Sequence, residues 1–552
     1  MNKSGKRNNF VMQAGILAAA GMVSRIIGLL YRSPLHRVIG DLGMGYYQAA
    51  FAYYNIILLI SSYSIPAALS KVIAQKLAVK EYRNAHRMFR CALCYVLVVG
   101  GIASLLLFFG AGWFVAGEAV PVLRTFAPTI FVYGILGVLR GYFQAHKSMV
   151  QTSISQILEQ IANAVVSIGA ATILIRSVMG SLEVPADLDS QVVRATNGAI
   201  GSALGTGAGV LVALLFMLAV FALNRQIIGR RMKKDRHGED SYGEIFRTII
   251  LVVTPFILST AVYNLSGTVN NTVYTKLLPE IRKLDTVGIY TRWGVFSGQA
   301  LTISNIPIAF ASAMAAAVLP SVAQMVASDN LKEARRKTGV AVKTTMILSI
   351  PCAVGLFVLA RPVTGLLFRN TPEAEDLATR LLMSLSLSVV FFALSTLNSS
   401  ILQGIGKVNR PIINAGIALA VQTVTAVVLL FFTDLDLYAI AIANTLYAGV
   451  MCLLNQIAVH KALEYRQEVV KTFLVPLLAS VFMGAFAWAV YEGLLLLTAS
   501  PRISVVIAIC LAVCVYFGML LLLRGVSEEE LRGFPKGYLL VKVAKRCGLM
   551  KA

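Results

Sequence analysis

The feature that most constrains this chain is a series of long apolar stretches that recur from near its start to Leu523. Each stretch can supply the roughly 20 residues that a helix needs to span a bilayer. Hydrophobic residues make up 57% of the sequence and charged residues only 14%, which is too apolar for an ordinary water-soluble protein. The sequence therefore predicts an all-α polytopic membrane protein.

We expect about fourteen transmembrane helices, with boundaries accurate to about 2 to 4 residues. The predicted ranges are 10–33, 44–66, 90–113, 122–145, 150–176, 193–223, 245–272, 289–318, 338–360, 377–403, 411–433, 436–460, 472–498 and 502–524.

The net charge of +23 is distributed over short segments between the apolar stretches, not over one continuous surface. This distribution does not favour a nucleic-acid partner, and it matches the positive-inside rule, by which Lys and Arg near span ends stay in the cytoplasm. Basic clusters at 71–87, 230–236 and 332–337 alternate with acidic loops around Glu118, Asp187 and Asp434. Both termini are predicted to lie on the cytoplasmic side of a bacterial cytoplasmic membrane.

A faint internal repeat accompanies this alternation. At a shift of 249 positions, Ala74-Gln75 matches Ala323-Gln324, and Ala85-x-Arg87 matches Ala334-x-Arg336. The repeat predicts two parallel six-helix lobes with two further helices appended. The predicted parts are an N-lobe at 1–223, a basic cytoplasmic linker at 224–244, a C-lobe at 245–461, and the last two spans with a cytoplasmic tail at 462–552.

Two arginines on the first span are the leading candidates for substrate binding. Gly21, Arg25, Gly28 and Arg32 recur at helical spacing and share one face, so the two guanidiniums lie roughly 10 Å apart along the axis. Arginine inside a membrane is costly, whereas its planar fork binds phosphate oxygens bidentately. The alternative is that Arg32 reaches the outer interface and Arg25 pairs with a structural carboxylate.

A third cation, Arg292, begins the eighth span, and polar side chains that include Gln299 and Asn305 follow it. Pro307 in the same span lacks a backbone donor and favours a kink. These features are typical of a helix that lines a moving cavity, although Arg292 alone is also compatible with an interfacial anchor.

Other intramembrane polar residues are candidates for cavity lining or ion coupling. Asn264, Thr268 and Asn271 share a stripe of the seventh span, and Glu159 lies on a polar stripe of the fifth. Glu159 either binds a coupling cation or proton, or pairs with an arginine; its amide neighbours are equally suited to interhelical hydrogen bonds.

The sequence contains neither a nucleotide-binding loop nor a nucleophile or metal constellation, so we predict no enzymatic activity and no cofactor or metal site. Energy for transport would come from a monovalent cation gradient, the membrane potential or downstream consumption of the product.

The segments Ala18 to Arg32 (AAAGMVSRIIGLLYR), Ile39 to Gln48 (IGDLGMGYYQ) and Ser64-Ile65-Pro66 resemble the stage V sporulation protein B type of polysaccharide exporter. That family is part of the multidrug, oligosaccharidyl-lipid and polysaccharide exporter superfamily, which includes the MurJ lipid II flippases. The resemblance implies a V-shaped pair of lobes around a cationic cavity that holds the lipid II diphosphate while the lobes rock.

In this resemblance Arg25, Arg32 and Arg292 match arginines of the family, Arg32 with a displacement of one residue. The second span departs from the MurJ pattern, because it has Tyr46-Tyr47-Gln48 and Ile56 to Ile60 where an acidic residue and a further arginine are usual.

Our leading hypothesis is that the chain flips an undecaprenyl-diphosphate-linked cell-wall precursor, with membrane lipids and cell-wall synthesis proteins as further partners. The alternatives are a cation-coupled multidrug antiporter of the same superfamily, which should use acidic cavity residues, and a non-transporting scaffold of wall-synthesis complexes. We further expect the three arginines to line one cavity between the lobes, in its outer half.

Overall fold

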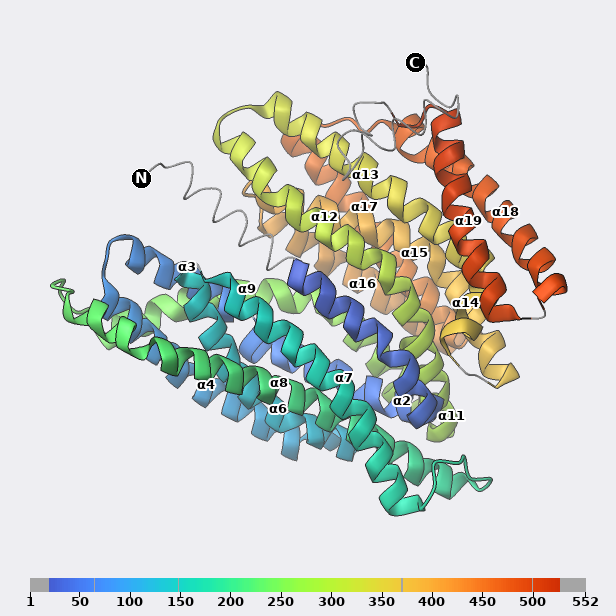
Figure 1. Cartoon of the computed structure of the whole chain (residues 1–552), viewed down its shortest axis with the longest axis horizontal. Helices are drawn as coiled ribbons and strands as arrows, with labels where there is room; N and C mark the ends of the chain where they lie inside the picture. Colours follow the sequence, from blue (N-terminus) through green and yellow to red (C-terminus); the bar gives the residue numbers. More distant parts are fainter. Residues whose placement is uncertain (1–18, 64, 147, 369–370, 499, 527–552) are drawn as a thin grey trace. The chain divides into compact units, whose positions relative to one another are not determined.

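The computed structural model describes residues 19–526, apart from 64, 147, 369–370 and 499. Every regular element in this part of the chain is helical (Figure 1). Residues 10–18 of the predicted first span and the predicted tail beyond 526 lie outside it. By internal contacts the chain forms two compact units, Met1–Gly298 and Gln299–Ala552. The predicted lobe boundaries at 223 and 245 remain a prediction.

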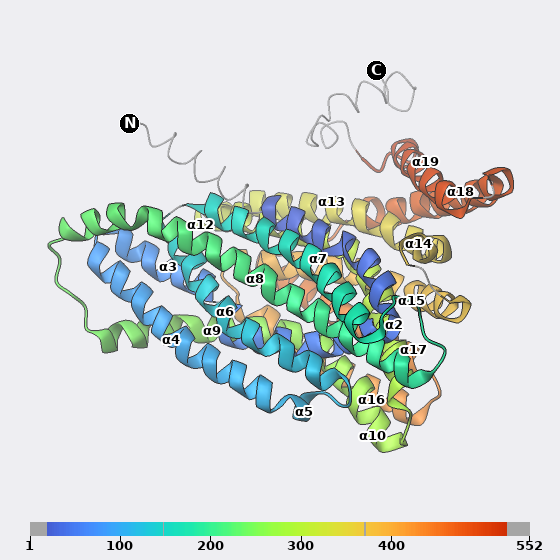
Figure 2. The ribbon, with the colours of Figure 1, turned by 60° about the horizontal axis from the view of Figure 1, so that its bottom comes forward.

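Within its described residues, the first unit holds a helix at Ala19–Leu30 and ten labelled α-helices. These are α2 (Arg32–Leu58), α3 (Ile65–Ala78), α4 (Tyr82–Phe109), α5 (Ala111–Phe114), α6 (Ala119–Ala145), α7 (Met149–Met179), α8 (Leu188–Lys233), α9 (Tyr242–Thr272), α10 (Leu278–Arg282) and α11 (Thr286–Trp293). Short π-helical segments, in which each hydrogen bond spans one extra residue, are η1 (Leu59–Tyr63), η2 (Val273–Leu277) and η3 (Gly294–Ala300). Helices α7 and α8 run side by side (Figures 1 and 2).

The second unit begins at Gln299, within η3, and continues into α12. Its elements are α12 (Leu301–Ala327), α13 (Leu331–Val358), α14 (Ala360–Leu367), α15 (Pro372–Gly404), α16 (Asn409–Phe432), α17 (Leu437–Leu463), η4 (Val470–Leu474), α18 (Val475–Thr498) and α19 (Pro501–Leu522). Helices α18 and α19 form the terminal helical pair, drawn in red in both views.

Eleven helices of the described residues are long and apolar enough to cross a membrane. They are α4, α6, α7, α8, Thr286–Ala327, α13, α15, α16, α17, Val470–Thr498 and α19. The chain is thus an all-helical, multi-pass membrane protein, as predicted. The predicted first, second and seventh spans correspond to Ala19–Leu30, α2 and α9, which are helical but not among the eleven.

The first helix extends beyond its predicted end near residue 33. Pro34 has no N–H, yet the Leu35 N–H still donates to the Tyr31 carbonyl at 3.0 Å, and the helix continues to Ile39. Gly40 then adopts φ 72° and ψ −178°, a left-handed region that suits glycine, and the chain changes direction. Arg32 therefore lies eight residues before the turn, not at the end of the helix.

Side chains around this turn satisfy the polar groups that it exposes. The Arg194 guanidinium of α8 donates to the Val38 carbonyl at 2.7 Å, and His36 hydrogen-bonds to Asp41 at 2.8 Å. A Cβ on Gly43 would lie only 3.1 Å from the Ala195 carbonyl oxygen of α8. The glycine-rich motif at 40–45 thus serves both the turn and close helix packing.

The internal repeat has a structural counterpart in the turns that precede α4 and α13. Lys80 and Asp329, which are 249 positions apart, both have positive φ, at 66° and 55°. Their N–H groups bond to the carbonyls of Leu77 and Val326, which are again 249 positions apart. In each unit the helix after the turn also packs on the next long helix, α4 on α6 and α13 on α15.

The connection between α8 and α9 is folded against the start of α4. Asp235 accepts hydrogen bonds from the backbone N–H of Arg83 at 2.8 Å and of His237 at 2.9 Å. Burial opposes ionisation of this carboxyl, but these donors and the His237 ring outweigh burial and lower its pKa to about 2. Arg87 adds a cation–π contact to Tyr242. Part of the predicted basic linker is therefore an ordered clasp, which we define as residues 234–242.

Candidate functional site

The arginine stripe of the first span lies on a helix that packs beside α7. A Cβ on Gly28 would lie 3.4 Å from the Gln160 amide oxygen, so Gly28 allows this close approach. Arg25, one turn earlier, is exposed and has no hydrogen bond or ion pair with any other described residue. Arg32 is partly buried, and the Tyr47 hydroxyl of α2 lies within electrostatic range of its guanidinium.

Arg292 is positioned by an unusually close crossing of α11 and α2. A Cβ on Gly45 would lie 1.9 Å from the Tyr290 carbonyl oxygen, and one on Gly294 would lie 1.9 Å from the Asp41 carbonyl oxygen. Only glycine fits at either position. Arg292 is exposed and lies between Tyr290 and Gly294, the two residues of this segment that make the crossing. The structure therefore brings the helices of Arg32 and Arg292 into one unit.

The three polar residues of the seventh span lie in two kinds of surroundings. Thr268 donates to the Ala52 carbonyl at 3.4 Å and Asn271 to the Ala49 carbonyl at 3.2 Å, so both hold α9 against α2. The Asn271 amide oxygen is buried without a partner among the described residues. Asn264, by contrast, is exposed.

The eighth span has an irregular backbone segment before Pro307, the residue at which a kink was predicted. Backbone bonding is π-helical from Gly294 to Ala300, directly after the glycine crossing, and Pro307 follows inside α12. Gln299 is fully buried and Asn305 is exposed. Segments of π-helix within longer helices are frequent at functional sites.

Glu159 forms a buried ion pair. The Arg140 guanidinium of α6 donates to the Glu159 carboxylate at 2.7 Å and to the Ser155 hydroxyl at 2.9 Å. The two charged side chains are only 5% and 16% exposed. Of the two roles considered for Glu159, this geometry is that of a carboxylate paired with an arginine. Sequence reasoning did not single out Arg140, although an arginine well inside a predicted span is itself a signal.

A second polar cluster, in the second unit, consists of amides and hydroxyls. Asn414 of α16 donates to the Asn455 amide oxygen of α17 at 2.8 Å, and Asn455 donates to the Ser399 hydroxyl of α15 at 2.9 Å. Among the described residues, no three His, Cys, Asp or Glu side chains are grouped so that they could hold a metal ion.

The first unit thus carries cations of two kinds. Arg140 is neutralised by a carboxylate in the protein, whereas exposed Arg25 has no such partner in the described chain. A guanidinium of the second kind is available to an external anion, and phosphate oxygens match its donor geometry.

Comparison with known families identifies the family of this chain. The family model described as lipid II flippase MurJ matches residues 88–509, which is well over half of the chain. The chain belongs to the lipid II flippase MurJ family.

Two relatives from Bacillus subtilis (strain 168) extend the similarity over most of the chain. The lipid II flippase MurJ is 24% identical over 497 residues, with 87% of each chain covered. Stage V sporulation protein B is 23% identical over 546 residues, covering 96% of this chain and 98% of the relative. The family resemblance seen in the first spans is therefore confirmed.

Solved structures of the MurJ family and its neighbours share the fold. A lipid II flippase MurJ in an inward closed conformation matches with a TM-score of 0.65 at 16% identity, covering 91% of this chain and 97% of that one. An inward-facing MATE family transporter of the MOP superfamily matches with a TM-score of 0.62 at 18% identity, covering 82% and 99%. These relatives are flippases and transporters, not enzymes, which agrees with the prediction for this chain.

Proposed function

We propose that this protein translocates an undecaprenyl-diphosphate-linked cell-wall precursor, lipid II or a related lipid-linked oligosaccharide, across the bacterial cytoplasmic membrane. Arg25, Arg32 and Arg292 would bind the diphosphate. Membership of the MurJ family supports the class of substrate.

The observation that carries the proposal is the position of the arginine stripe. Because the first helix runs on to Gly40, Arg32 lies about 12 Å of helical rise before the turn, and Arg25 is about 10 Å further from it. Neither position corresponds to the end of the helix, where an arginine could simply reach the interface.

Arg292 supports the same site from the eighth span. The glycine crossing sets Gly294 against Asp41 and Tyr290 against Gly45, so Arg292 lies beside the start of the segment that follows the turn at Gly40, while Arg32 precedes that turn. A dianionic diphosphate that contacted both guanidiniums would be held by cations from both helices.

Transport would follow an alternating-access cycle of two six-helix lobes, with fourteen spans and both termini in the cytoplasm. The diphosphate would bind more tightly to one lobe arrangement than to the other, and this difference in binding would shift the conformational equilibrium. The coupling force would be a monovalent cation gradient or the membrane potential. Asn264, Gln299 and Asn305 would line the cavity, while Thr268 and Asn271 would fix the wall formed by α9 and α2.

A cation-coupled multidrug antiporter is the second candidate, because the fold is shared with MATE transporters. Such a protein needs a carboxylate that is available to cationic compounds. Glu159 is instead paired with Arg140, which weighs against this candidate.

The proposal is tested in cells that lack every redundant flippase. Depletion should leave labelled precursor inside the cell, and Arg25→Ala should fail to restore its appearance outside although the protein accumulates in the membrane. Complementation by Arg25→Ala would favour a non-transporting scaffold. Normal export of precursor in the depleted cells would refute the proposal.

A further inference from the structure

Helix α8 continues beyond its apolar sequence and carries a group of cations there. It has 46 residues, or about 69 Å of helical rise, which exceeds the bilayer thickness of about 40–45 Å with headgroups. The apolar sequence ends at Leu223, and the helix runs on for about 15 Å to Lys233. This end of the helix and the residues directly after it hold six cations, which we call the α8 cations: Arg225, Arg230, Arg231, Lys233, Lys234 and Arg236.

The α8 cations are not neutralised within the described part of the chain. All six are exposed, and none of their side chains forms a hydrogen bond or an ion pair with another described residue. Arg230 and Lys234 are one helical turn apart, and like charges at this spacing repel each other. An external anion would therefore lower the electrostatic energy of the group.

The carboxylates that follow the α8 cations in sequence are bound to other helices by the clasp. Each of the three binds a group on α3 or α4: Asp235 the Arg83 N–H at 2.8 Å, Glu239 the Arg87 guanidinium, and Asp240 the Lys76 ammonium at 2.6 Å. The clasp thus pairs its negative charges with cations of α3 and α4. The end of α8 is left as a surface of positive charge.

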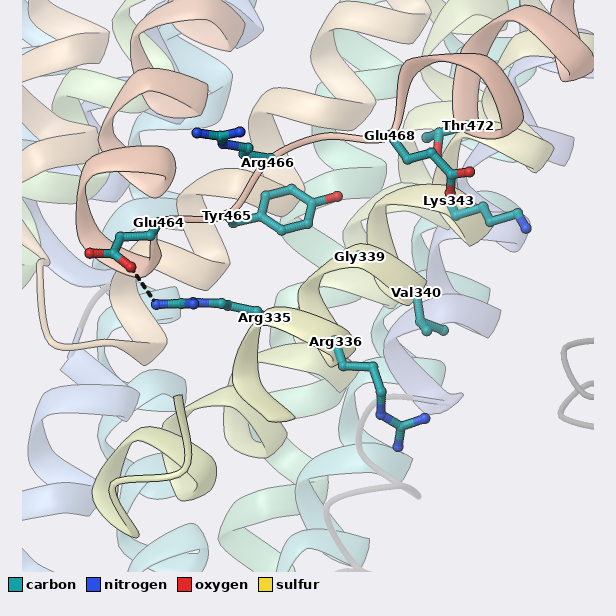
Figure 3. Close-up of a pocket in the computed structure, with 10 residues that line it drawn as sticks. All are labelled: Arg335, Arg336, Gly339, Val340, Lys343, Glu464, Tyr465, Arg466, Glu468 and Thr472. Carbon is teal, nitrogen blue, oxygen red and sulfur yellow. Dashed lines mark hydrogen bonds and ion pairs between the residues drawn. The ribbon is translucent and has the colours of Figure 1, made fainter. Parts of the chain in front are cut away.

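The basic cluster at the start of α13 differs in this respect. Arg335 pairs with the Glu464 carboxylate at 2.7 Å (Figure 3), and Arg336 pairs with Glu333 at 2.6 Å. The exposed lysines of this cluster, Lys332 and Lys337, lie next to the same Glu333 in sequence and one helical turn from it. Carboxylates therefore neutralise part of the α13 cluster, which makes it a suitable comparison for the α8 cations.

Exposed apolar side chains precede the cations on the same face of α8. Leu223 and Ile227 are 81% and 51% exposed, and Arg230 follows them at helical spacing. Phe221 and Ile228, on another face, pack against the buried core of the first unit. A bilayer presents acyl chains first and phosphate headgroups next, which is the order of these side chains along the helix. An acidic soluble protein would match the cations alone, so the surface favours a lipid.

We propose that the α8 cations bind the phosphate headgroups of anionic phospholipids, with acyl chains along Leu223 and Ile227. Groups of about four to eight Lys or Arg directly beyond the cytoplasmic end of a transmembrane helix are suited to anionic lipids. With the predicted topology, the lipids belong to the leaflet that adjoins the cytoplasm. This surface shares no residue with the proposed diphosphate site, so the two proposals are tested separately.

The test compares the double variant Lys233→Gln/Lys234→Gln with the matched double variant Lys332→Gln/Lys337→Gln. Each pair removes two exposed lysines, and the control pair belongs to the partly neutralised α13 cluster. Purified full-length protein is titrated with phosphatidylglycerol, phosphatidylcholine or a hexaglutamate peptide. Native mass spectrometry measures retention of the lipid or peptide, and Tm reports whether each variant is folded.

Phosphatidylglycerol should be retained by the wild type and the control, and its apparent affinity should fall about fivefold or more in Lys233→Gln/Lys234→Gln. Fivefold corresponds to about 1 kcal/mol, the effect of one cation near an anionic headgroup layer. Arg230→Gln should give a similar fall, and it serves as the test if the double variant does not fold. Equal affinity in the α8 variants and the wild type, an equal fall in the control, or phosphatidylcholine retained to the same degree would overturn the proposal. Hexaglutamate retained as strongly as phosphatidylglycerol would identify an acidic protein segment as the occupant and overturn the lipid assignment.

Discussion

The ion pair between Arg140 and Glu159 makes the sharpest stability prediction. Replacing Arg140 with Met would leave the Glu159 carboxylate without its cation in a site where it is only 16% exposed. The Ser155 hydroxyl would keep its own hydrogen bond to the Thr152 carbonyl at 2.7 Å. The loss is therefore confined to the ion pair and to one hydrogen bond from Arg140.

The expected magnitude follows from this burial. Removing one partner of a buried ion pair destabilises proteins by about 3–5 kcal/mol, and the partial exposure of Glu159 favours the lower end, about 3 kcal/mol. Replacing both residues with Met removes the stranded charge together with its partner. The double variant should then return to within about 1 kcal/mol of the wild type.

Equilibrium unfolding in mixed detergent micelles, followed by tryptophan fluorescence, gives the free energy of unfolding for each variant. Arg124→Met is the matched control, because Arg124 is an exposed arginine of the same helix, and it should cost less than about 1 kcal/mol. The reasoning fails if Arg140→Met is no more destabilising than Arg124→Met. It also fails if the double variant is as unstable as the single one.

Two further predictions follow from the backbone crossing and the clasp. Gly294→Ala should lower thermal stability and block function, since its Cβ would meet a backbone oxygen of α2 at 1.9 Å, whereas Gly267→Ala, with open space around it, should be neutral or slightly stabilising. Asp235→Asn should cost about 1–3 kcal/mol and speed proteolysis within the clasp. Because the folded pKa of Asp235 is about 2, below its ordinary value, its stabilisation is present above about pH 4 and is lost as pH falls toward 2. Thermal unfolding should show this acid-dependent loss in the wild type and not in Asp235→Asn.

The spans were predictable because hydrocarbon thickness sets their length. From the third span onward, predicted and observed helices coincide, apart from extensions such as that of α8 beyond 223 to Lys233. Length and apolarity do not encode where a helix turns in a polar segment. The predicted end near residue 33 followed the polar triplet Arg32-Ser33-Pro34, but the decisive residue was Gly40, whose backbone conformation ends the helix.

For the candidate site, sequence periodicity predicts which residues share a helical face. Periodicity placed Arg25, Gly28 and Arg32 on one stripe, and Gly28 does face a neighbouring helix. Periodicity does not specify how two helices are aligned along their axes. The choice between ion coupling and ion pairing for Glu159 therefore depended on its contact with Arg140, which only the packing of α6 against α7 reveals.

The central claim is that Arg25 belongs to a diphosphate site that moves its ligand across the membrane. Transport of a fluorescent undecaprenyl-diphosphate-linked sugar by reconstituted proteoliposomes tests it most directly. Arg37→Ala is the matched control, since Arg37 is an exposed arginine of the same helix, off the stripe. Wild type and Arg37→Ala should translocate the lipid, Arg25→Lys should do so weakly because it keeps the charge without the planar fork, and Arg25→Ala should not. Transport by Arg25→Ala at the wild-type rate would contradict the account.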